Sequence, residues 1–196
     1  SESSKNGIIE DFNCKNTNIT VINNGLDTDE FSPIEDIKRN KFRLITTASA
    51  DVPLKGLDYT LKALNILKND FPEIQLIIIG SLKKGGHTQK LIKKLNLEQY
   101  IIFKTNISKK EIKELYAESS IAIVSSLYEG FGYPVIEAMS CEVPLIATNV
   151  SSIPELTSKY ALLVDPKNSE MISAGVKNIL SNYEKSVSYT HLTLPT

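Results

Sequence analysis

One stretch of the chain decides its fold, residues 121–148, which reads IAIVSSLYEGFGYPVIEAMSCEVPLIAT. It begins with four apolar residues in a row, 121–124, and ends with a second short strand-like run, 145–148, of which the first three residues are apolar. Between the two lies a glycine-containing loop that runs into a helix, which we expect to begin with Pro134 at its first position. Strands that are apolar on both faces and joined by a helix pair in parallel within a buried sheet. The stretch therefore predicts a strand–helix–strand unit with a right-handed crossover.

The same alternation of strand-like and helix-like segments continues along the rest of the chain. From Leu57 to Leu67, four leucines recur at intervals of three and four residues, as on one face of a helix. Ser108 and Glu111 form a capping box ahead of another helical pattern. These segments predict an α/β domain with a doubly wound parallel sheet, a Rossmann-like fold. Its six strands are expected at residues 42–47, 74–79, 100–103, 121–124, 145–148 and 161–164.

Composition is that of an ordinary globular domain and excludes several classes of protein. The 196 residues suffice for one domain, and a formal net charge of -1 offers no field that would attract nucleic acid or an anionic membrane. Cys14 and Cys141 lie far apart in the sequence, without Cys or His neighbours at metal-ligand spacing, so neither a disulfide framework nor a zinc site is expected. No apolar run approaches the roughly 18 residues of a membrane span. We therefore expect a cytoplasmic protein that does not bind nucleic acid.

The two ends of the chain differ from this central pattern. Residues 19–22 are apolar and strand-like, and a loop rich in turn-forming residues follows them. We interpret residues 1–32 as an interdomain connection with the remnant of an N-terminal domain, and residues 33–185 as the Rossmann-like domain. Residues 186–196 have neither a helical period nor a strand partner, so we interpret them as a non-native tail in which His191 has no role.

The loop after the strand at 121–124 carries the most informative residues. In sheets of this type, ligands bind beyond the carboxyl ends of the strands. Gly130 and Gly132, on either side of Phe131, would let backbone N–H groups approach a ligand closely, and the helix N-terminus that follows suits a diphosphate. Glu137 could accept hydrogen bonds from two neighbouring ribose hydroxyls, while Glu129 could reach a sugar hydroxyl or a developing positive charge. Spacing alone leaves two other interpretations open, a pair of solvated acids and the acid–base pair of a glycoside hydrolase.

The same loop resembles the signature of a known enzyme family. Residues 126–132 and 137–141, SLYEGFG and EAMSC, are similar to group 1 (family 4) retaining glycosyltransferases, whose signature includes two glutamates with seven residues between them. The resemblance implies the C-terminal, donor-binding half of a GT-B enzyme that needs no metal ion or other cofactor. It also implies that Glu137 holds the ribose of the donor and that Glu129 lies beside the transferred sugar as the catalytic residue. The likeness covers about residues 19–183 and recurs at residues 21–27, 31, 143–148, 153–156 and 162–164.

Other positions match the family outside this loop. Lys55 stands where family members usually place a lysine against the donor phosphates, although the residue alone would suggest a solvated lysine at a helix start. Ile107 stands where related enzymes read the nucleobase, and equally fits a hydrophobic staple before the cap at Ser108. An arginine is usual five positions before the lysine, where this chain has Ala50, so one phosphate-neutralising charge is missing. The residues predicted to bind the donor are Lys55, Gly80, Ile107, Gly130, Phe131, Gly132 and Glu137.

The resemblance implies a function and a set of partners. We expect a domain that binds a nucleoside diphosphate sugar for retaining transfer to an acceptor, as in polysaccharide biosynthesis, with a missing N-terminal acceptor domain as its partner. The chain alone is expected to be inactive, and peripheral membrane association of the parent enzyme is compatible with the resemblance. The alternative is a non-catalytic nucleotide-binding or regulatory module of the same fold, which Ala50 would suit. No P-loop and no Gly-x-Gly-x-x-Gly motif is present, which argues against nucleoside triphosphatases and NAD-dependent oxidoreductases.

Overall fold

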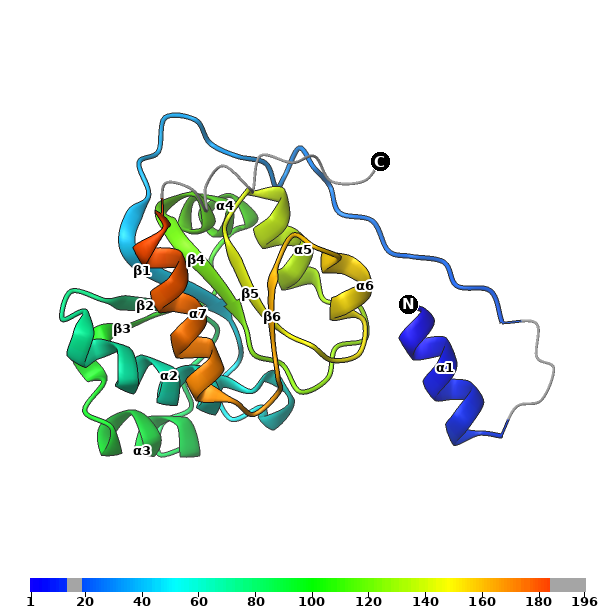
Figure 1. Cartoon of the computed structure of the whole chain (residues 1–196), viewed down its shortest axis with the longest axis horizontal. Coiled ribbons are helices and arrows are strands. Elements are labelled where there is room, and N and C mark those ends of the chain that lie inside the picture. Colours follow the sequence, from blue (N-terminus) through cyan, green and yellow to red (C-terminus); the bar gives the residue numbers. More distant parts are fainter. Residues whose placement is uncertain (14–18, 184–196) are drawn as a thin grey trace.

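The computed structural model describes residues 1–13 and 19–183, and a parallel sheet forms its centre (Figure 1). The strands of the sheet are β1 Asn40–Thr47, β2 Gln75–Ile79, β3 Ile101–Lys104, β4 Ser119–Val124, β5 Leu145–Thr148 and β6 Leu162–Val164. They lie in the order β3-β2-β1-β4-β5-β6, and each neighbouring pair is parallel. Every residue of β4 is buried, because β4 is a central strand with helices over both faces.

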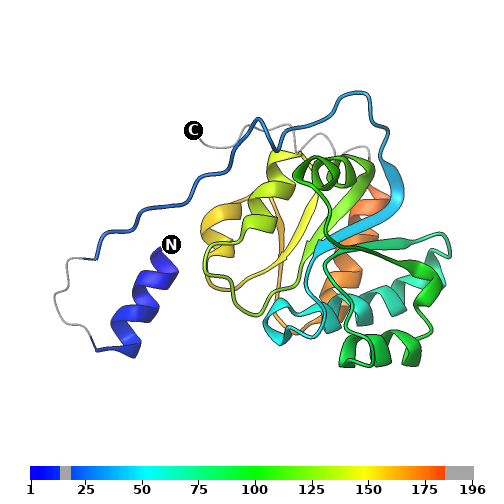
Figure 2. The same ribbon diagram turned by 180° about the vertical axis from the view of Figure 1, so that it is seen from behind.

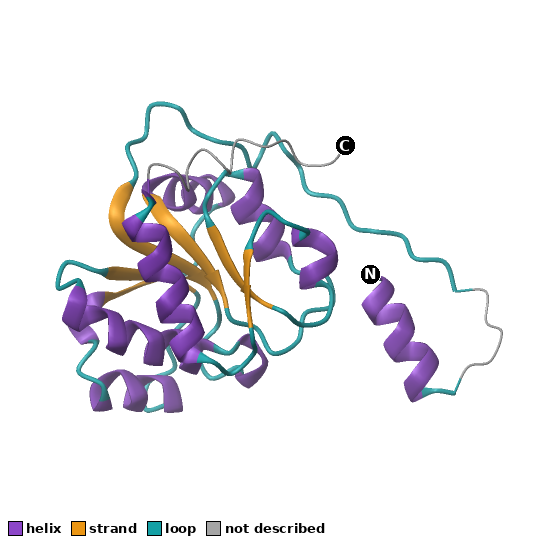
Figure 3. Ribbon diagram, in the orientation of Figure 1, coloured by secondary structure: helices purple, strands orange, loops and turns teal. Residues whose placement is uncertain are grey.

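Helices cover the sheet on both faces (Figures 2 and 3). The helices are α1 Glu2–Asp11, α2 Leu57–Asp70, α3 His87–Lys94, α4 Lys109–Glu118, α5 Tyr133–Ser140, α6 Ile153–Thr157 and α7 Ser169–Ser181, with short 3-10 helices η1 Pro53–Lys55 and η2 Glu98–Tyr100. Apolar side chains of α2, α3 and α7 pack on one face, and those of α4, α5 and α6 pack on the other. Among the described residues, no helix is both long enough and apolar enough to cross a membrane.

The order of the strands reverses between β1 and β4. The chain moves outward from β1 through β2 to β3, returns to the centre at β4, and then moves outward on the other side through β5 to β6. Leu44 of β1 pairs with Ile121 of β4, so the carboxyl ends of these two strands lie side by side. In open parallel sheets, ligands bind at such a reversal point. The loops after β1 and β4 are therefore where the fold itself places a site.

The sequence predictions for this domain are confirmed in outline and wrong in one detail, the start of a helix. All six strands are present in parallel order, and the capping box of Ser108 and Glu111 makes both of its hydrogen bonds. Helix α5 begins one residue before Pro134, because Gly132 ends the loop in a left-handed conformation with φ 102°. Residues 19–22, which are strand-like in sequence and which we interpreted as part of an interdomain connection, form no strand in the described part of the chain. The domain limits at 32/33 and 185/186 stay predictions, and residues 186–196 lie outside the described part of the chain.

The segment before the sheet makes several contacts with the domain, including those of Phe31 and of α1. Phe31 is buried in the apolar cluster beneath α4 and α5, and its backbone carbonyl oxygen accepts a hydrogen bond from the Ser140 hydroxyl. Farther upstream, the N-terminal end of α1 lies against α6. There the backbone N–H groups of Glu2 and Ser3 donate to the carboxylate of Glu155 at 2.9 and 2.7 Å. These contacts bring α1 to the side of the domain where the loop after β4 emerges.

Candidate functional site

The loop that follows β4, residues 125–132, is fixed against the end of η1. The backbone N–H of Leu127 donates to the carbonyl oxygen of Leu54 at 2.7 Å, and the Ser125 hydroxyl donates to that of Gly56 at 3.0 Å. Gly56 adopts φ 62°, and a Cβ atom there would lie 1.9 Å from the carbonyl oxygen of Ser125. Only glycine permits both this conformation and this approach. The two segments therefore form one rigid unit at the carboxyl edge of the sheet.

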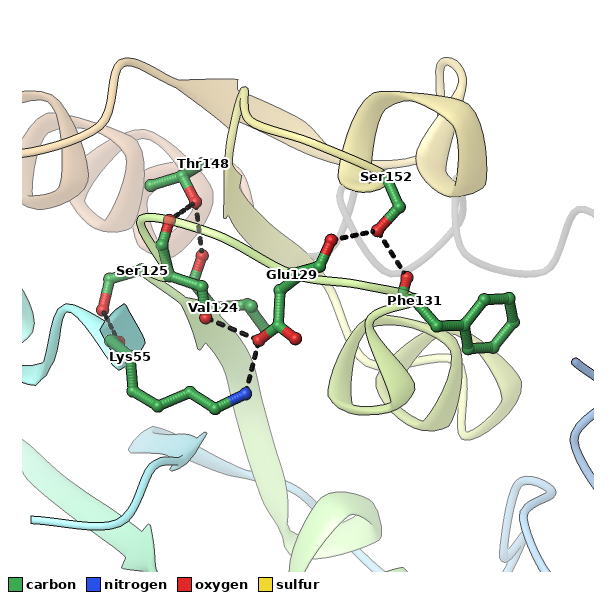
Figure 4. A network of polar contacts seen from close by, with 8 residues as sticks. Lys55, Val124, Ser125, Glu129, Phe131, Thr148 and Ser152 are labelled. Carbon is green, nitrogen blue, oxygen red and sulfur yellow. Dashed lines mark hydrogen bonds and ion pairs between the residues drawn. The ribbon is translucent and has the colours of Figure 1, made fainter. Parts of the chain in front are cut away.

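Lys55 and Glu129 meet within this unit (Figure 4). The ammonium of Lys55 donates to Glu129 Oε1 at 2.7 Å, and the Ser126 hydroxyl donates to the same oxygen at 2.7 Å. Glu129 is 8% exposed, whereas the side chain of Lys55 is 33% exposed. Glu129 Oε2 has no hydrogen-bond donor among the described residues. Lys55 and Ser126 thus hold the buried Glu129 carboxylate in one orientation, in which Oε2 can accept a hydrogen bond from a ligand.

Backbone N–H groups follow directly after this carboxylate. Those of Gly130, Phe131 and Gly132 donate no hydrogen bond within the described part of the chain. A Cβ atom on Gly130 would have no atom within 4 Å, so this turn borders open space. Gly132 is the N-cap of α5, whose N-terminus carries partial positive charge. Successive unpaired amides at a helix N-terminus can bind an anion such as a phosphate.

The carbonyl groups of this turn are held from the opposite side. The Ser152 hydroxyl lies 3.0 Å from the carbonyl oxygen of Glu129 and 2.7 Å from that of Phe131, and donates to both (Figure 4). The hydroxyls of Ser1 and Ser4, at the N-terminus of α1, donate to the Gly130 carbonyl oxygen between those two. The carbonyl oxygens of Glu129, Gly130 and Phe131 therefore all accept hydrogen bonds from hydroxyl groups, whereas the N–H groups of Gly130, Phe131 and Gly132 have no acceptor among the described residues.

Glu137 lies in α5, and it is set apart from the Lys55–Glu129 pair. Tyr116 is buried in α4, and its hydroxyl donates to Glu137 Oε2 at 3.3 Å. Burial raises the pKa of Glu137 from its ordinary value, and the Tyr116 hydrogen bond and the charge of Lys109 offset part of this rise. Burial also raises the pKa of Tyr116, so this phenol stays a neutral donor. Glu137 is thus a half-buried carboxyl group with one oxygen held by a fixed donor.

Two predicted donor-binding residues have packing roles in the structure. A Cβ atom on Gly80 would lie 2.4 Å from the carbonyl oxygen of Ala48, so glycine is required where the ends of β1 and β2 approach. Ile107 packs against the same apolar cluster as Ile112, as a hydrophobic staple beside the Ser108 cap does. Contact of Gly80 or Ile107 with a donor stays a prediction. The backbone N–H of Ala50 donates to the Ser81 carbonyl oxygen and so is not free to replace the absent arginine.

Several residues of the site were missed by reasoning from the sequence. Ser126, Thr148 and Ser152 all donate hydrogen bonds into the loop after β4, and Tyr116 holds Glu137. Ser126 could have been found as a hydroxyl placed two residues after the end of a buried strand. Ser152 could not, because its partners precede it by more than 20 residues. Among the described residues, no three His, Cys, Asp or Glu side chains gather as metal ligands would.

Comparison with known proteins identifies similar sequences and folds. The family described as Glycosyl transferases group 1 matches residues 28–191. The MMP alpha-(1->4)-mannosyltransferase of Mycolicibacterium hassiacum is 33% identical over 185 residues, which are 93% of this chain and 44% of that protein. The O-antigen chain mannosyltransferase RfbU of Salmonella typhimurium is 26% identical over 175 residues, which are 89% of this chain and 48% of that protein. This chain thus spans about half the length of the curated relatives it matches.

Solved structures share the fold. The C-terminal domain of a glycosyl transferase group 1 family protein (LpcC) from Francisella tularensis superposes with a TM-score of 0.73 at 24% identity, covering 85% of this chain and 93% of that one. Alr3699/HepE from Anabaena, in complex with UDP and glucose, superposes with a TM-score of 0.75 at 21% identity, covering 87% of this chain and 50% of that one. At these identities the likeness establishes the fold, which is that of the C-terminal domain of such enzymes.

Proposed function

Because the chain belongs to the glycosyl transferases of group 1, we propose that it binds a nucleoside diphosphate sugar and supplies the donor half of a site for retaining transfer of that sugar to an acceptor. The observation that carries this proposal is the Lys55–Glu129 pair beside the N–H groups of residues 130–132, which have no acceptor among the described residues. The site lies where the strand order reverses, at the position expected for a nucleotide. HepE, which shares the fold, holds UDP and glucose in its structure, which supports a donor of this class.

The diphosphate would lie at the turn of residues 130–132. Its negative charge suits the free amides, the N-terminus of α5 and the ammonium of Lys55. A lysine side chain that is one-third exposed can swing from a carboxylate to a phosphate without leaving the site. Ser126 would keep its hydrogen bond to Glu129 during this movement. In this proposal the Lys55–Glu129 ion pair forms in the absence of the donor, and the bound diphosphate replaces Glu129 as the partner of Lys55.

Glu129 would act on the transferred sugar. As the bond from the anomeric carbon to the diphosphate oxygen breaks, the electron pair leaves with the diphosphate and positive charge develops on the sugar. Lys55 and the amides would stabilise the departing oxygen, and the free oxygen of Glu129 would stabilise the sugar or accept a bond from one of its hydroxyls. The acceptor hydroxyl then bonds to the anomeric carbon, and its proton passes to the departing diphosphate. This scheme uses no metal ion.

Glu137 would bind the ribose of the donor. Tyr116 holds one oxygen of this carboxylate, which leaves the other to accept hydrogen bonds from ribose hydroxyls. Two curated relatives are mannosyltransferases by name, which supports a hexosyl donor. The acceptor site would lie on an N-terminal domain of a longer parent protein, so we expect no transfer by this chain alone. A cytoplasmic location and a role in polysaccharide biosynthesis form part of the same proposal.

Calorimetric titration with UDP, GDP and ADP tests the proposed function. One nucleotide should bind in preference to the others, and Glu137→Ala should weaken it on the order of tenfold, as loss of a charged hydrogen bond predicts. Glu73→Ala is the matched control, because Glu73 is exposed and forms no ion pair among the described residues. Absence of binding by a chain that circular dichroism shows to be folded would contradict the proposal that this chain forms the nucleotide site.

A further inference from the structure

Ser152 is a buried serine at the start of a helix whose hydroxyl does not cap that helix. It is the N-cap residue of α6, where a serine ordinarily accepts a hydrogen bond from an amide of its own helix. Its side chain makes no such bond, and the residue is 0% exposed. The hydroxyl instead reaches the loop after β4 and donates to the carbonyl oxygens of Glu129 and Phe131 (Figure 4). One buried hydroxyl therefore joins two different loops at the carboxyl edge of the sheet.

These two carbonyl groups determine where two N–H groups point. The peptide bond between Glu129 and Gly130 and the one between Phe131 and Gly132 are both trans, so each carbonyl and the N–H of the same peptide point in opposite directions. With both carbonyls directed at Ser152, the N–H groups of Gly130 and Gly132 are directed away from it. Glycine has little intrinsic preference among backbone conformations, so these peptides would rotate easily without an external hydrogen bond.

We infer that Ser152 is a positioning residue for the donor diphosphate. Its hydroxyl keeps the Glu129–Gly130 and Phe131–Gly132 peptides in the orientation that presents the amides of Gly130 and Gly132 to the ligand. This inference rests on the proposed function for the identity of the ligand, although the orientation of the amides can be measured without one. Because Ser152 is 0% exposed and bonds only to main-chain carbonyls, it would act on the donor through the main chain of the loop.

Backbone dynamics test the positioning role without a ligand. In the native chain, the N–H order parameters of Gly130 and Gly132 should be close to about 0.85, and in Ser152→Ala they should fall below about 0.6. Ser152→Cys, with a weak donor of similar size, should fall between. Thr157→Val is the matched control, because Thr157 is equally buried in α6 and its hydroxyl donates to Ile153 of the same helix. Unchanged order parameters in Ser152→Ala, or an equal fall in Thr157→Val, would overturn the inference.

Titration then links this role to the diphosphate. Uridine, guanosine and adenosine are compared with UDP, GDP and ADP, so that the affinity added by the diphosphate can be separated from that of the nucleoside. Ser152→Ala should weaken the diphosphate on the order of tenfold while the nucleoside changes less than about twofold. An equal loss of affinity for the nucleoside and the nucleoside diphosphate would overturn the inference, since it would indicate that the substitution disturbs the whole site and not the diphosphate contacts alone. If the native chain binds none of the six compounds, the proposed function fails, and the order parameters still decide the role of Ser152.

Discussion

Replacing Lys55 with methionine removes the charge that faces Glu129 and keeps the length of the side chain. Lys55 Nζ lies 2.7 Å from Glu129 Oε1, and the Glu129 side chain is 9% exposed whereas that of Lys55 is 33% exposed. In the variant, the Ser126 hydroxyl alone among the described residues would donate to this buried carboxylate. Removing one partner of a fully buried pair costs about 3–5 kcal/mol. Because water reaches Lys55, we expect the free energy of unfolding to fall by a smaller amount, about 1–2 kcal/mol.

A double-mutant cycle with Lys55→Met and Glu129→Gln separates the interaction energy of these two side chains from the effect that each substitution has by itself. Each variant is unfolded in urea at pH 7 and followed by far-ultraviolet circular dichroism, and we expect a coupling energy of about 1–2 kcal/mol. The exposed pair Lys110–Glu114, at 3.9 Å, provides a control cycle with Lys110→Met and Glu114→Gln that should give about 0.5 kcal/mol or less. If the effects of Lys55→Met and Glu129→Gln add to within about 0.5 kcal/mol, the two side chains are not coupled and the reasoning is refuted.

Three further predictions concern stability and can be measured in the same urea assay. Gly56→Ala places a Cβ atom against the carbonyl oxygen of Ser125 at φ 62° and should lower the free energy of unfolding by at least about 2 kcal/mol. The control Gly25→Ala, whose Cβ atom would have no atom within 4 Å, should change it by less than about 0.5 kcal/mol. Similar losses for both variants would contradict the predicted clash at Gly56. Phe31→Ala should cost about 3 kcal/mol because the side chain is 3% exposed, and a loss below about 1 kcal/mol would show that its segment is not docked. Burial raises the pKa of Glu137 above 4.5, so the folded chain holds this proton more tightly than the unfolded chain. The stability from this group is therefore fully present below about pH 4.5 and is lost as pH rises through the folded pKa. In Glu137→Gln the free energy of unfolding should no longer fall over this pH range, and a variant with the same pH profile as the native chain would contradict this prediction.

The arrangement of the sheet was predictable from the sequence because its strands are short, apolar and continuous. A strand such as residues 121–124 must be buried on both faces, and helical segments between such strands leave the parallel α/β arrangement as the simplest solution. The cap at Ser108 was predictable for a similar reason, since both partners lie within one turn. A strand-like pattern is not sufficient for a strand: residues 19–22 have such a pattern but form no strand, because a strand also needs a partner to pair with.

The site was predictable only where its parts are close in the sequence. Glu129 and the turn of residues 130–132 follow each other, so their proximity follows from the chain itself. The pairing of Lys55 with Glu129, across 74 residues, depends on the packing of η1 against the loop after β4. The roles of Ser152 and Tyr116 depend on the angles at which α6 and α4 pack, which no local pattern encodes.

The central claim is that the turn of residues 130–132 and Lys55 bind the diphosphate of a nucleotide sugar. It is tested most directly by recording the amide signals of Gly130, Phe131 and Gly132 by nuclear magnetic resonance while the nucleoside diphosphate is added, with the matching nucleoside as control. We predict that the three amide protons shift downfield with the diphosphate, as new hydrogen bonds to anionic oxygens require, and stay in place with the nucleoside. Saturable binding of the diphosphate that leaves these three signals unmoved would contradict the account.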